Sequence, residues 1–126
     1  NIFSMSLAIL YSGIIAWIIS FDTYYALEDK DDDERIGVNS TAILWGNNSI
    51  IYSKILHIFF YMCLLIIGII NSFSYFFYIF FFLLIYLFIH QGKIIKKKNY
   101  IEAFKINNWI GIVALFSFVF EIIFLS

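Results

Sequence analysis

The sequence predicts an all-α integral membrane protein, a helical bundle in which four helices span the bilayer. Of its 126 residues, 63% are hydrophobic and only 13% are charged, against about 25% charged residues in an ordinary soluble domain. Proline is absent, and four stretches are long and apolar enough to cross a membrane. A soluble fold of this size cannot bury so much apolar surface. The composition therefore argues against a disordered chain, a nucleic-acid-binding protein and a soluble enzyme domain.

The expected membrane spans cover residues 2–25, 50–70, 73–89 and 107–125. A helix needs about 20 mostly apolar residues to cross about 30 Å of hydrocarbon, and each stretch is close to that length. Strands in lipid must close into a barrel, and barrel strands alternate polar and apolar residues, which these runs do not. We expect the whole chain to form a single membrane domain.

The connecting loops predict the orientation of the spans. The second and third spans are separated only by a short turn, so the loops at residues 28–49 and 90–105 are expected on the same side of the membrane. Five of the eight basic residues lie between Lys93 and Lys105. Because short loops rich in Lys and Arg stay on the cytoplasmic side, both loops are predicted to be cytoplasmic.

The acidic residues are concentrated at the end of the first span. Seven of the nine acids lie between Asp22 and Glu34. Asp22, Asp29 and Asp33 are spaced i, i+7 and i+11, which places them within about 40° of one another if one helix continues through them. Tyr25 shares that face. Like charges repel there, and the helix dipole disfavours anions at a C-terminus.

A bound cation would offset this repulsion, and several carboxylate oxygens suit Mg²⁺. The alternative interpretation is a solvated acidic loop between two spans. The residues that follow favour the first interpretation, because Gly37 permits a sharp turn and Ser40 or Thr41 can cap a new helix. We therefore expect the chain to turn tightly back to the membrane and to form an acidic pocket at one end of the bundle.

The acidic segment belongs to a longer motif, and a second, weaker motif lies near the last span. The first contains Asp22, Thr23, Tyr25, Ala26, Asp29, Lys30, Asp31, Asp32, Asp33, Ile36, Gly37, Val38, Ser40, Thr41, Ala42, Ile43, Leu44 and Gly46. The second contains Ala103, Phe104, Lys105, Asn107, Asn108 and Gly111. The first motif resembles the second aspartate-rich motif of the UbiA family of intramembrane prenyltransferases. The second is similar to the start of that family's last helix.

The resemblance implies a nine-helix bundle, of which this chain is similar to the last four helices. It implies an enzyme that binds Mg²⁺ and a polyprenyl diphosphate and prenylates an aromatic acceptor, with 4-hydroxybenzoate of ubiquinone biosynthesis as the expected acceptor. Homogentisate, a naphthoate or haem are the alternative acceptors, and a non-enzymatic cation-binding membrane segment is the alternative outside the family. The expected location is a bacterial inner membrane, with lipid around the helices and the active site toward the cytoplasm. No nucleic acid partner is expected.

The resemblance also implies roles for individual residues. It assigns metal binding to Asp22, Asp29 and Asp33. It assigns catalysis to Asp29, Asp33 and Lys30, and the diphosphate side of the site to Asp22 and Lys30. Residue chemistry adds Tyr25 as a catalytic candidate, because its ring shares the aspartate face and can stabilise a carbocation, and Arg35 as a further basic group on the diphosphate side. The family's first aspartate-rich motif does not occur in this sequence. A missing N-terminal half is expected to supply it, so the chain alone is expected to be inactive, whether it is a fragment of a longer enzyme or a decayed gene product.

Overall fold

The computed structural model describes residues 2–30, 35–37 and 40–124. The described residues are almost entirely helical, and no strand occurs among them. In chain order the elements are α1 (Ile2–Glu28), α3 (Thr41–Trp45), the short 3₁₀ helix η1 (Gly46–Asn48), α4 (Ser49–Ile70), α5 (Tyr75–Lys96), α6 (Tyr100–Val119) and a terminal π-helical turn η2 (Phe120–Phe124).

Four helical stretches are long and apolar enough to cross a membrane: Ser4–Glu28, Thr41–Ile70, Tyr75–Lys96 and Tyr100–Ile123. This confirms the predicted fold class, an all-α bundle with four membrane-capable helices. The helices continue beyond the predicted spans, and a tight turn at residues 97–99 is all that separates α5 from α6. Because a helix can extend past the hydrocarbon, the span and loop boundaries stay predictions.

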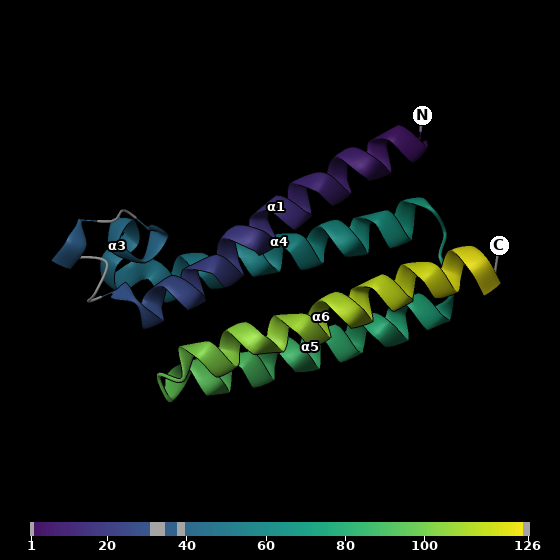
Figure 1. Cartoon of the computed structure of the whole chain (residues 1–126). Coiled ribbons are helices and arrows are strands. Elements are labelled where there is room, and N and C mark those ends of the chain that lie inside the picture. The colour runs from purple at the N-terminus through teal and green to yellow at the C-terminus, as the bar shows by residue number, and fades with distance from the viewer. Residues whose placement is uncertain (1, 31–34, 38–39, 125–126) are drawn as a thin grey trace.

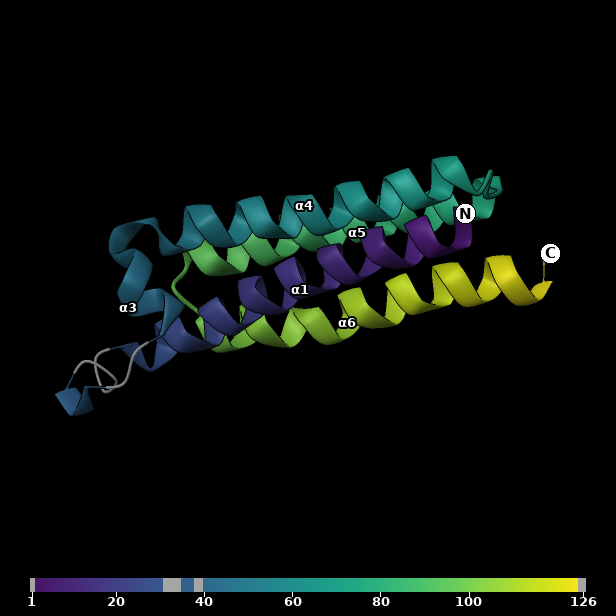
Figure 2. The ribbon, with the colours of Figure 1, turned by 90° about the horizontal axis from the view of Figure 1, so that it is seen from above.

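The four long helices form two antiparallel pairs that face each other (Figure 1). α1 packs along α4, and α5 packs along α6. A view from above shows α1 lying beside α6 as well, which joins the two pairs (Figure 2). Both termini and the α4–α5 turn lie at one end, which we call the hairpin end. The C-terminal end of α1, α3 and the turn at residues 97–99 lie at the other, which we call the motif end.

Close approach between helices depends on small residues, as is usual in membrane bundles. A Cβ added to Gly13 of α1 would lie 2.9 Å from the Cβ of Cys63, so this glycine lets α1 approach α4. A Cβ added to Gly68 would lie 2.6 Å from the ring of Phe77. Cys63 itself is buried, as its position in an apolar run suggests.

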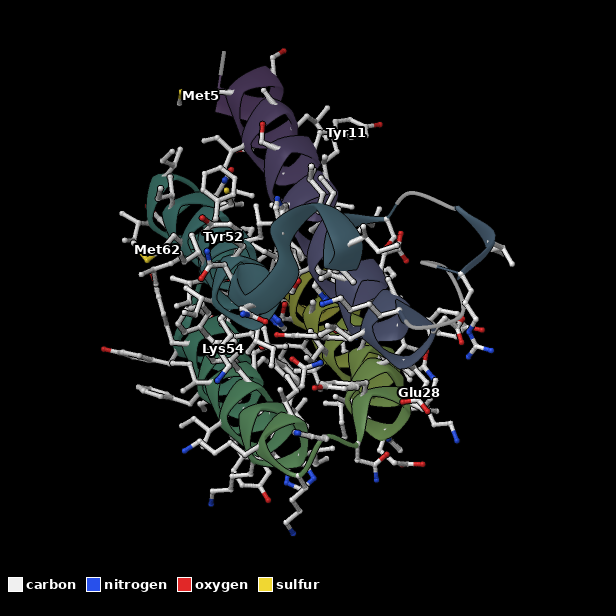
Figure 3. All side chains as sticks on the ribbon, turned by 90° about the vertical axis from the view of Figure 1, so that its left-hand side faces the viewer. Met5, Tyr11, Glu28, Tyr52, Lys54 and Met62 are labelled. Atoms are coloured by element: carbon white, nitrogen blue, oxygen red, sulfur yellow. The ribbon has the colours of Figure 1, made fainter. Side chains whose placement is uncertain are left out.

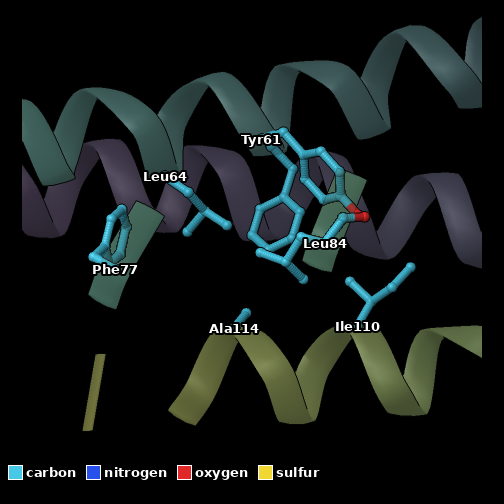
Figure 4. Packing of buried hydrophobic residues seen from close by; sticks show 7 residues of the cluster. Tyr61, Leu64, Phe77, Leu84, Ile110 and Ala114 are labelled. Carbon is cyan, nitrogen blue, oxygen red and sulfur yellow. The ribbon is translucent and has the colours of Figure 1, made fainter. Parts of the chain in front are cut away.

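Large side chains fill the space between the two pairs (Figure 4). Phe60 and Tyr61 of α4 are 2% and 5% exposed, and the Tyr61 hydroxyl donates a 2.7 Å hydrogen bond to the Leu84 carbonyl of α5. Trp17 of α1 stacks on Phe60 with ring centroids 5.0 Å apart. The core cluster consists of Phe60, Tyr61, Leu64, Phe77, Leu84, Ile110 and Ala114.

The hairpin end is closed by polar contacts. Ser74 precedes α5, and its backbone N–H and hydroxyl both donate to the carboxylate of Glu121, the latter over 2.8 Å. A carboxylate at this position complements the helix dipole of α5. The Asn71 amide donates to the Ser6 hydroxyl over 2.9 Å, which ties the turn to α1.

Candidate functional site at the motif end

The last two turns of α1 carry the first two predicted site residues. Asp22 and Tyr25 are both exposed there. The Tyr25 ring contacts Phe104 of α6, with centroids 5.2 Å apart. Phe21 contacts the same ring at 5.8 Å. The structure therefore places Tyr25 in an aromatic contact between α1 and α6, on the turn that follows Asp22.

α1 ends at Glu28, and the chain bends at Asp29. The single continuous helix assumed in the spacing argument is therefore not present, because the helix ends before the second of its three aspartates. Asp29 and Lys30 are half-buried. Asp33 lies outside the described residues, so its predicted place beside Asp22 and Asp29 stays a prediction.

The described residues contain no cluster of three or more acidic, His or Cys side chains that could hold a metal. Neither Asp22 nor Asp29 forms an ion pair within the described ranges. Arg35 is exposed and has an interaction partner. The described part thus brings Asp22 and Tyr25 onto adjacent turns of one helix, and it leaves both described aspartates without a basic partner there.

The chain folds back against α1 after the acidic segment. Ser40 caps α3, since its hydroxyl accepts a 3.3 Å hydrogen bond from the Ile43 N–H. The hydroxyls of Thr23 and Thr41 are 2.5 Å apart, which links α1 directly to the start of α3. Gly37 has φ +79°, a conformation that favours glycine. Of the two predicted caps, Ser40 and Thr41, Ser40 is the one that caps the helix, and Gly37 has the conformation that a sharp turn requires.

A polar cavity of about 260 Å³ opens beside this returning segment. Its lining residues include Lys30, which follows the end of α1, and Tyr100 at the start of α6. Its remaining lining residues come from the end of α1, from η1 and from the start of α4: Leu27, Gly46, Asn47, Ser49 and Ile50. Because Lys30 faces a cavity lined by several polar groups, it is positioned to meet an anion there.

An aromatic groove runs along the α1–α6 face, and Phe21, the residue before Asp22, is one of its lining residues. It has a volume of about 390 Å³ and is lined by Ile14, Trp17, Ile18, Phe21, Phe104, Asn107 and Asn108. The Trp17 indole N–H donates a 3.1 Å hydrogen bond to the Asn107 side-chain oxygen. The groove therefore combines ring faces with a fixed amide.

A layer of buried polar side chains crosses the bundle close to this groove, and sequence reasoning gave it no role. Ser20 donates a 2.7 Å hydrogen bond to the Ser53 carbonyl, and the Gln91 amide donates to the Ala103 carbonyl over 2.8 Å. Fully buried His57 lies between the rings of Tyr61 and Phe88. The available signal was the occurrence of polar residues inside apolar spans, which are often functional or interhelical.

Comparison with known protein families finds a match that covers most of the chain. Residues 1–118 match the UbiA prenyltransferase family. No solved structure matches the chain.

Curated relatives give a finer comparison. A protein of Francisella tularensis subsp. novicida named 4-hydroxybenzoate octaprenyltransferase is 35% identical over 108 residues, which cover 83% of this chain and 38% of the relative. A Tolumonas auensis protein of the same name is 37% identical over 108 residues, with the same coverage of both chains. The chain thus spans well under half the length of these relatives.

Proposed function

Because the chain belongs to the UbiA prenyltransferase family, we propose that the complete protein transfers a polyprenyl group from a polyprenyl diphosphate to 4-hydroxybenzoate. The family match supports prenyl transfer to an aromatic acceptor. The choice of 4-hydroxybenzoate rests on the names of the relatives. The observation that carries the proposal is the motif end itself. There the last turns of α1 carry Asp22 and Tyr25, Phe21 lines an aromatic groove and Lys30 lines a polar cavity.

In this proposal Asp22, Asp29 and Asp33 hold Mg²⁺. The donors fit such an ion, because Asp22 is accessible, Asp29 is half-buried and neither is neutralised by a basic partner in the described part of the chain. Carboxylate oxygens are the ligands that Mg²⁺ prefers. When bound, the ion would offset the charge of the diphosphate and make it a better leaving group.

The chain's own residues would bind and orient the substrates around this step. Lys30 would meet a diphosphate oxygen from its place in the polar cavity, and Arg35 would add positive charge on that side. Cleavage of the C–O bond leaves the diphosphate with the electron pair and an allylic cation on the prenyl chain. The rings of Tyr25 and Phe104 would stabilise that cation through their faces and exclude water from it.

The acceptor completes the reaction. The carbon of 4-hydroxybenzoate ortho to its hydroxyl attacks the allylic carbon, a C–C bond forms, and the ring then loses the proton from that carbon. The prenyl chain is apolar, so the groove along α1 and α6 is a suitable place for its first units. The full cavity, including the family's other aspartate-rich motif, would come from the rest of the protein.

The test is to incubate the complete protein, in membranes, with a labelled polyprenyl diphosphate, Mg²⁺ and one acceptor at a time. Prenylated 4-hydroxybenzoate is the expected product, and its loss on chelation of Mg²⁺ is the expected control. Product formed only with homogentisate, a naphthoate or haem would change the acceptor and keep the reaction. Mg²⁺ binding without any turnover would favour the cation-binding membrane segment instead.

We also propose that the motif end faces the cytoplasm of a bacterium, with the chain in the inner membrane. The clustering of Lys93, Lys96, Lys97 and Lys98 at that end supports this orientation. Since Cys63 is buried, added cysteines can be labelled selectively. A membrane-impermeant maleimide applied to intact spheroplasts should label Ser72→Cys at the hairpin end and spare Lys98→Cys. The reverse pattern would invert the topology.

A further inference from the structure

A basic groove lies between α4 and α5 near the motif end. It has a volume of about 280 Å³ and is lined by Lys54, Phe88, Ile89, Gly92, Lys93 and Lys96, which we call the lysine groove. Lys54 comes from the second turn of α4, while Lys93 and Lys96 come from the last turn of α5. Two helices thus contribute cations to one concave surface.

The groove exists because the backbones of α4 and α5 stay apart along most of their length, although Tyr61 and Gly68 of α4 contact α5 through side chains. The tight turn after Ile70 joins them, yet α4 packs along α1 and α5 packs along α6. Gly92 keeps the space open on the α5 side, since it has no side chain. The Lys54 ammonium lies 3.5 Å from the position that a Cβ at Gly92 would take. The half-buried Lys54 side chain thus reaches from α4 to α5 across the gap.

The three ammonium groups of the groove have no acidic partner. Within the described ranges, none of Lys54, Lys93 and Lys96 forms an ion pair or a side-chain hydrogen bond. The C-terminal dipole of α5 favours Lys93 and Lys96 individually. Clustered like charges still repel one another, so an anion bound among them would relieve the repulsion.

The rest of the groove is apolar. Phe88 is half-buried and Ile89 is exposed, and both lie within the membrane-capable stretch of α5. Lys93 and Lys96 lie nearer the end of that helix. A ligand that matches this order has a hydrocarbon part beside the two apolar side chains and a negative charge at the membrane surface.

We propose that the lysine groove binds an anionic phospholipid, with its phosphate among the three lysines and the upper part of an acyl chain against Phe88 and Ile89. This proposal rests on the membrane character of the four helices and not on the proposed enzymatic function. The groove is also distinct from the acidic site. Seen from the motif end, Lys54 and Glu28 lie on opposite sides of the bundle (Figure 3).

The test is native mass spectrometry of the 126-residue chain, titrated with phosphatidylglycerol and, separately, with phosphatidylcholine. The chain should retain phosphatidylglycerol preferentially. A lysine near the membrane surface contributes about fivefold to the binding of anionic lipid. The triple variant Lys54→Gln, Lys93→Gln, Lys96→Gln should therefore lose the preference by more than tenfold.

The matched control removes the same charge outside the groove, in the triple variant Lys97→Gln, Lys98→Gln, Lys105→Gln. It should keep most of the preference. Equal losses in both triple variants would overturn the proposal, because they would show attraction to net charge and not binding in a groove. Circular dichroism checks that both variants keep the helical content of the parent chain.

A second variant tests the shape of the groove without changing its charge. Gly92→Leu fills the space that Lys54 crosses, so it should weaken phosphatidylglycerol retention while leaving all three lysines in place. Unchanged retention would overturn the proposed location. A further arm adds inorganic phosphate at the same concentration as the lipid. Displacement of the lipid by phosphate would identify a soluble-phosphate site and contradict the lipid assignment.

Discussion

The two ends of the bundle are held together by different chemistry. In the half near the motif end, polar side chains lie between the helices, with Trp17 bonded to Asn107, Ser20 bonded to the backbone of Ser53, and Gln91 bonded to α6. In the half near the hairpin end, aromatic rings fill the interior, and the polar contacts of Asn71 with Ser6 and of Ser74 with Glu121 lie at the turn that closes it. Within this interior, Phe77 is 2% exposed and lies against the rings of Phe73, Tyr78 and Phe118.

The difference indicates that the two halves of the bundle have different roles. Hydrogen bonds fix direction as well as distance, so a polar interior suits the half that must position the acidic segment and its groove. Ring packing is less directional and depends on filled volume, so it suits a half whose task is to hold four helices together. Substitutions at the motif end should then affect the reaction most, and substitutions at the hairpin end should affect stability most.

The largest expected effect is at the acidic segment. In the complete protein, Asp29→Asn and Asp33→Asn should each lower kcat/KM for the polyprenyl diphosphate by about 10²-fold or more, the usual scale of losing one electrostatic contact to a transition state. Asp31→Asn should have a small effect, because Asp31 carries the same charge but is not among the three aspartates proposed to hold Mg²⁺. The measurement is a rate assay with labelled substrate over a range of Mg²⁺ concentrations.

Two outcomes would change this interpretation. Equal losses at Asp29 and Asp31 would show that the metal site also depends on Asp31, and the proposed set of three ligands would then be wrong. A loss of similar size in Glu102→Gln would indicate a general effect of charge, because Glu102 is exposed and pairs with Lys105.

The second expected effect is on stability at the hairpin end. Phe77→Ala should lower the free energy of unfolding in detergent micelles by about 2 kcal/mol. This cost comes from the cavity alone, because in the unfolded state the Phe77 ring is surrounded by apolar detergent and not by water. Phe82→Ala is the matched control, because that ring is 70% exposed and its loss should cost less than about 0.5 kcal/mol. Equal costs would mean that ring packing between helices does not stabilise this half.

The sequence was sufficient for the features that depend on local pattern. Four apolar runs predicted the four long helices, and the turn and cap at Gly37 and Ser40 followed from residue type. Motif spacing also led to the family, which the family comparison confirms.

The contacts between distant residues were beyond a sequence argument. Trp17 and Asn107 are 90 positions apart, and Ser74 and Glu121 are 47 apart. Periodicity specifies which face a residue occupies but not which helix meets that face. The aspartate spacing argument assumed a helix that continues through Asp33, although a loop was also predicted from residue 28, and α1 ends at Glu28. Nothing local stops the helix before Asp29, since the segment contains neither glycine nor proline.

The third expected effect concerns the contact that closes the hairpin end. Glu121→Gln keeps one acceptor for Ser74 but removes the charge that favours the start of α5, so it should cost about 1 kcal/mol in the same unfolding assay. Glu102→Gln, an exposed acid in a surface pair, should cost less than about 0.5 kcal/mol. Prenyl transfer by the complete Glu121→Gln protein should stay near that of the parent.

The smallest expected effect is the most specific to the motif end. Thr23→Val and Thr41→Val each remove one hydroxyl from the contact that links α1 to α3 while nearly preserving side-chain shape. In a double-mutant cycle their coupling energy in unfolding should be about 0.6 kcal/mol, typical of a hydrogen bond between membrane helices. The same cycle measured on KM for the diphosphate should show coupling of similar size, because the link holds the returning segment beside the acidic segment. Coupling in stability without coupling in KM would mean that this hydrogen bond supports the fold alone, and the proposed division between the two ends would then lose its most direct support.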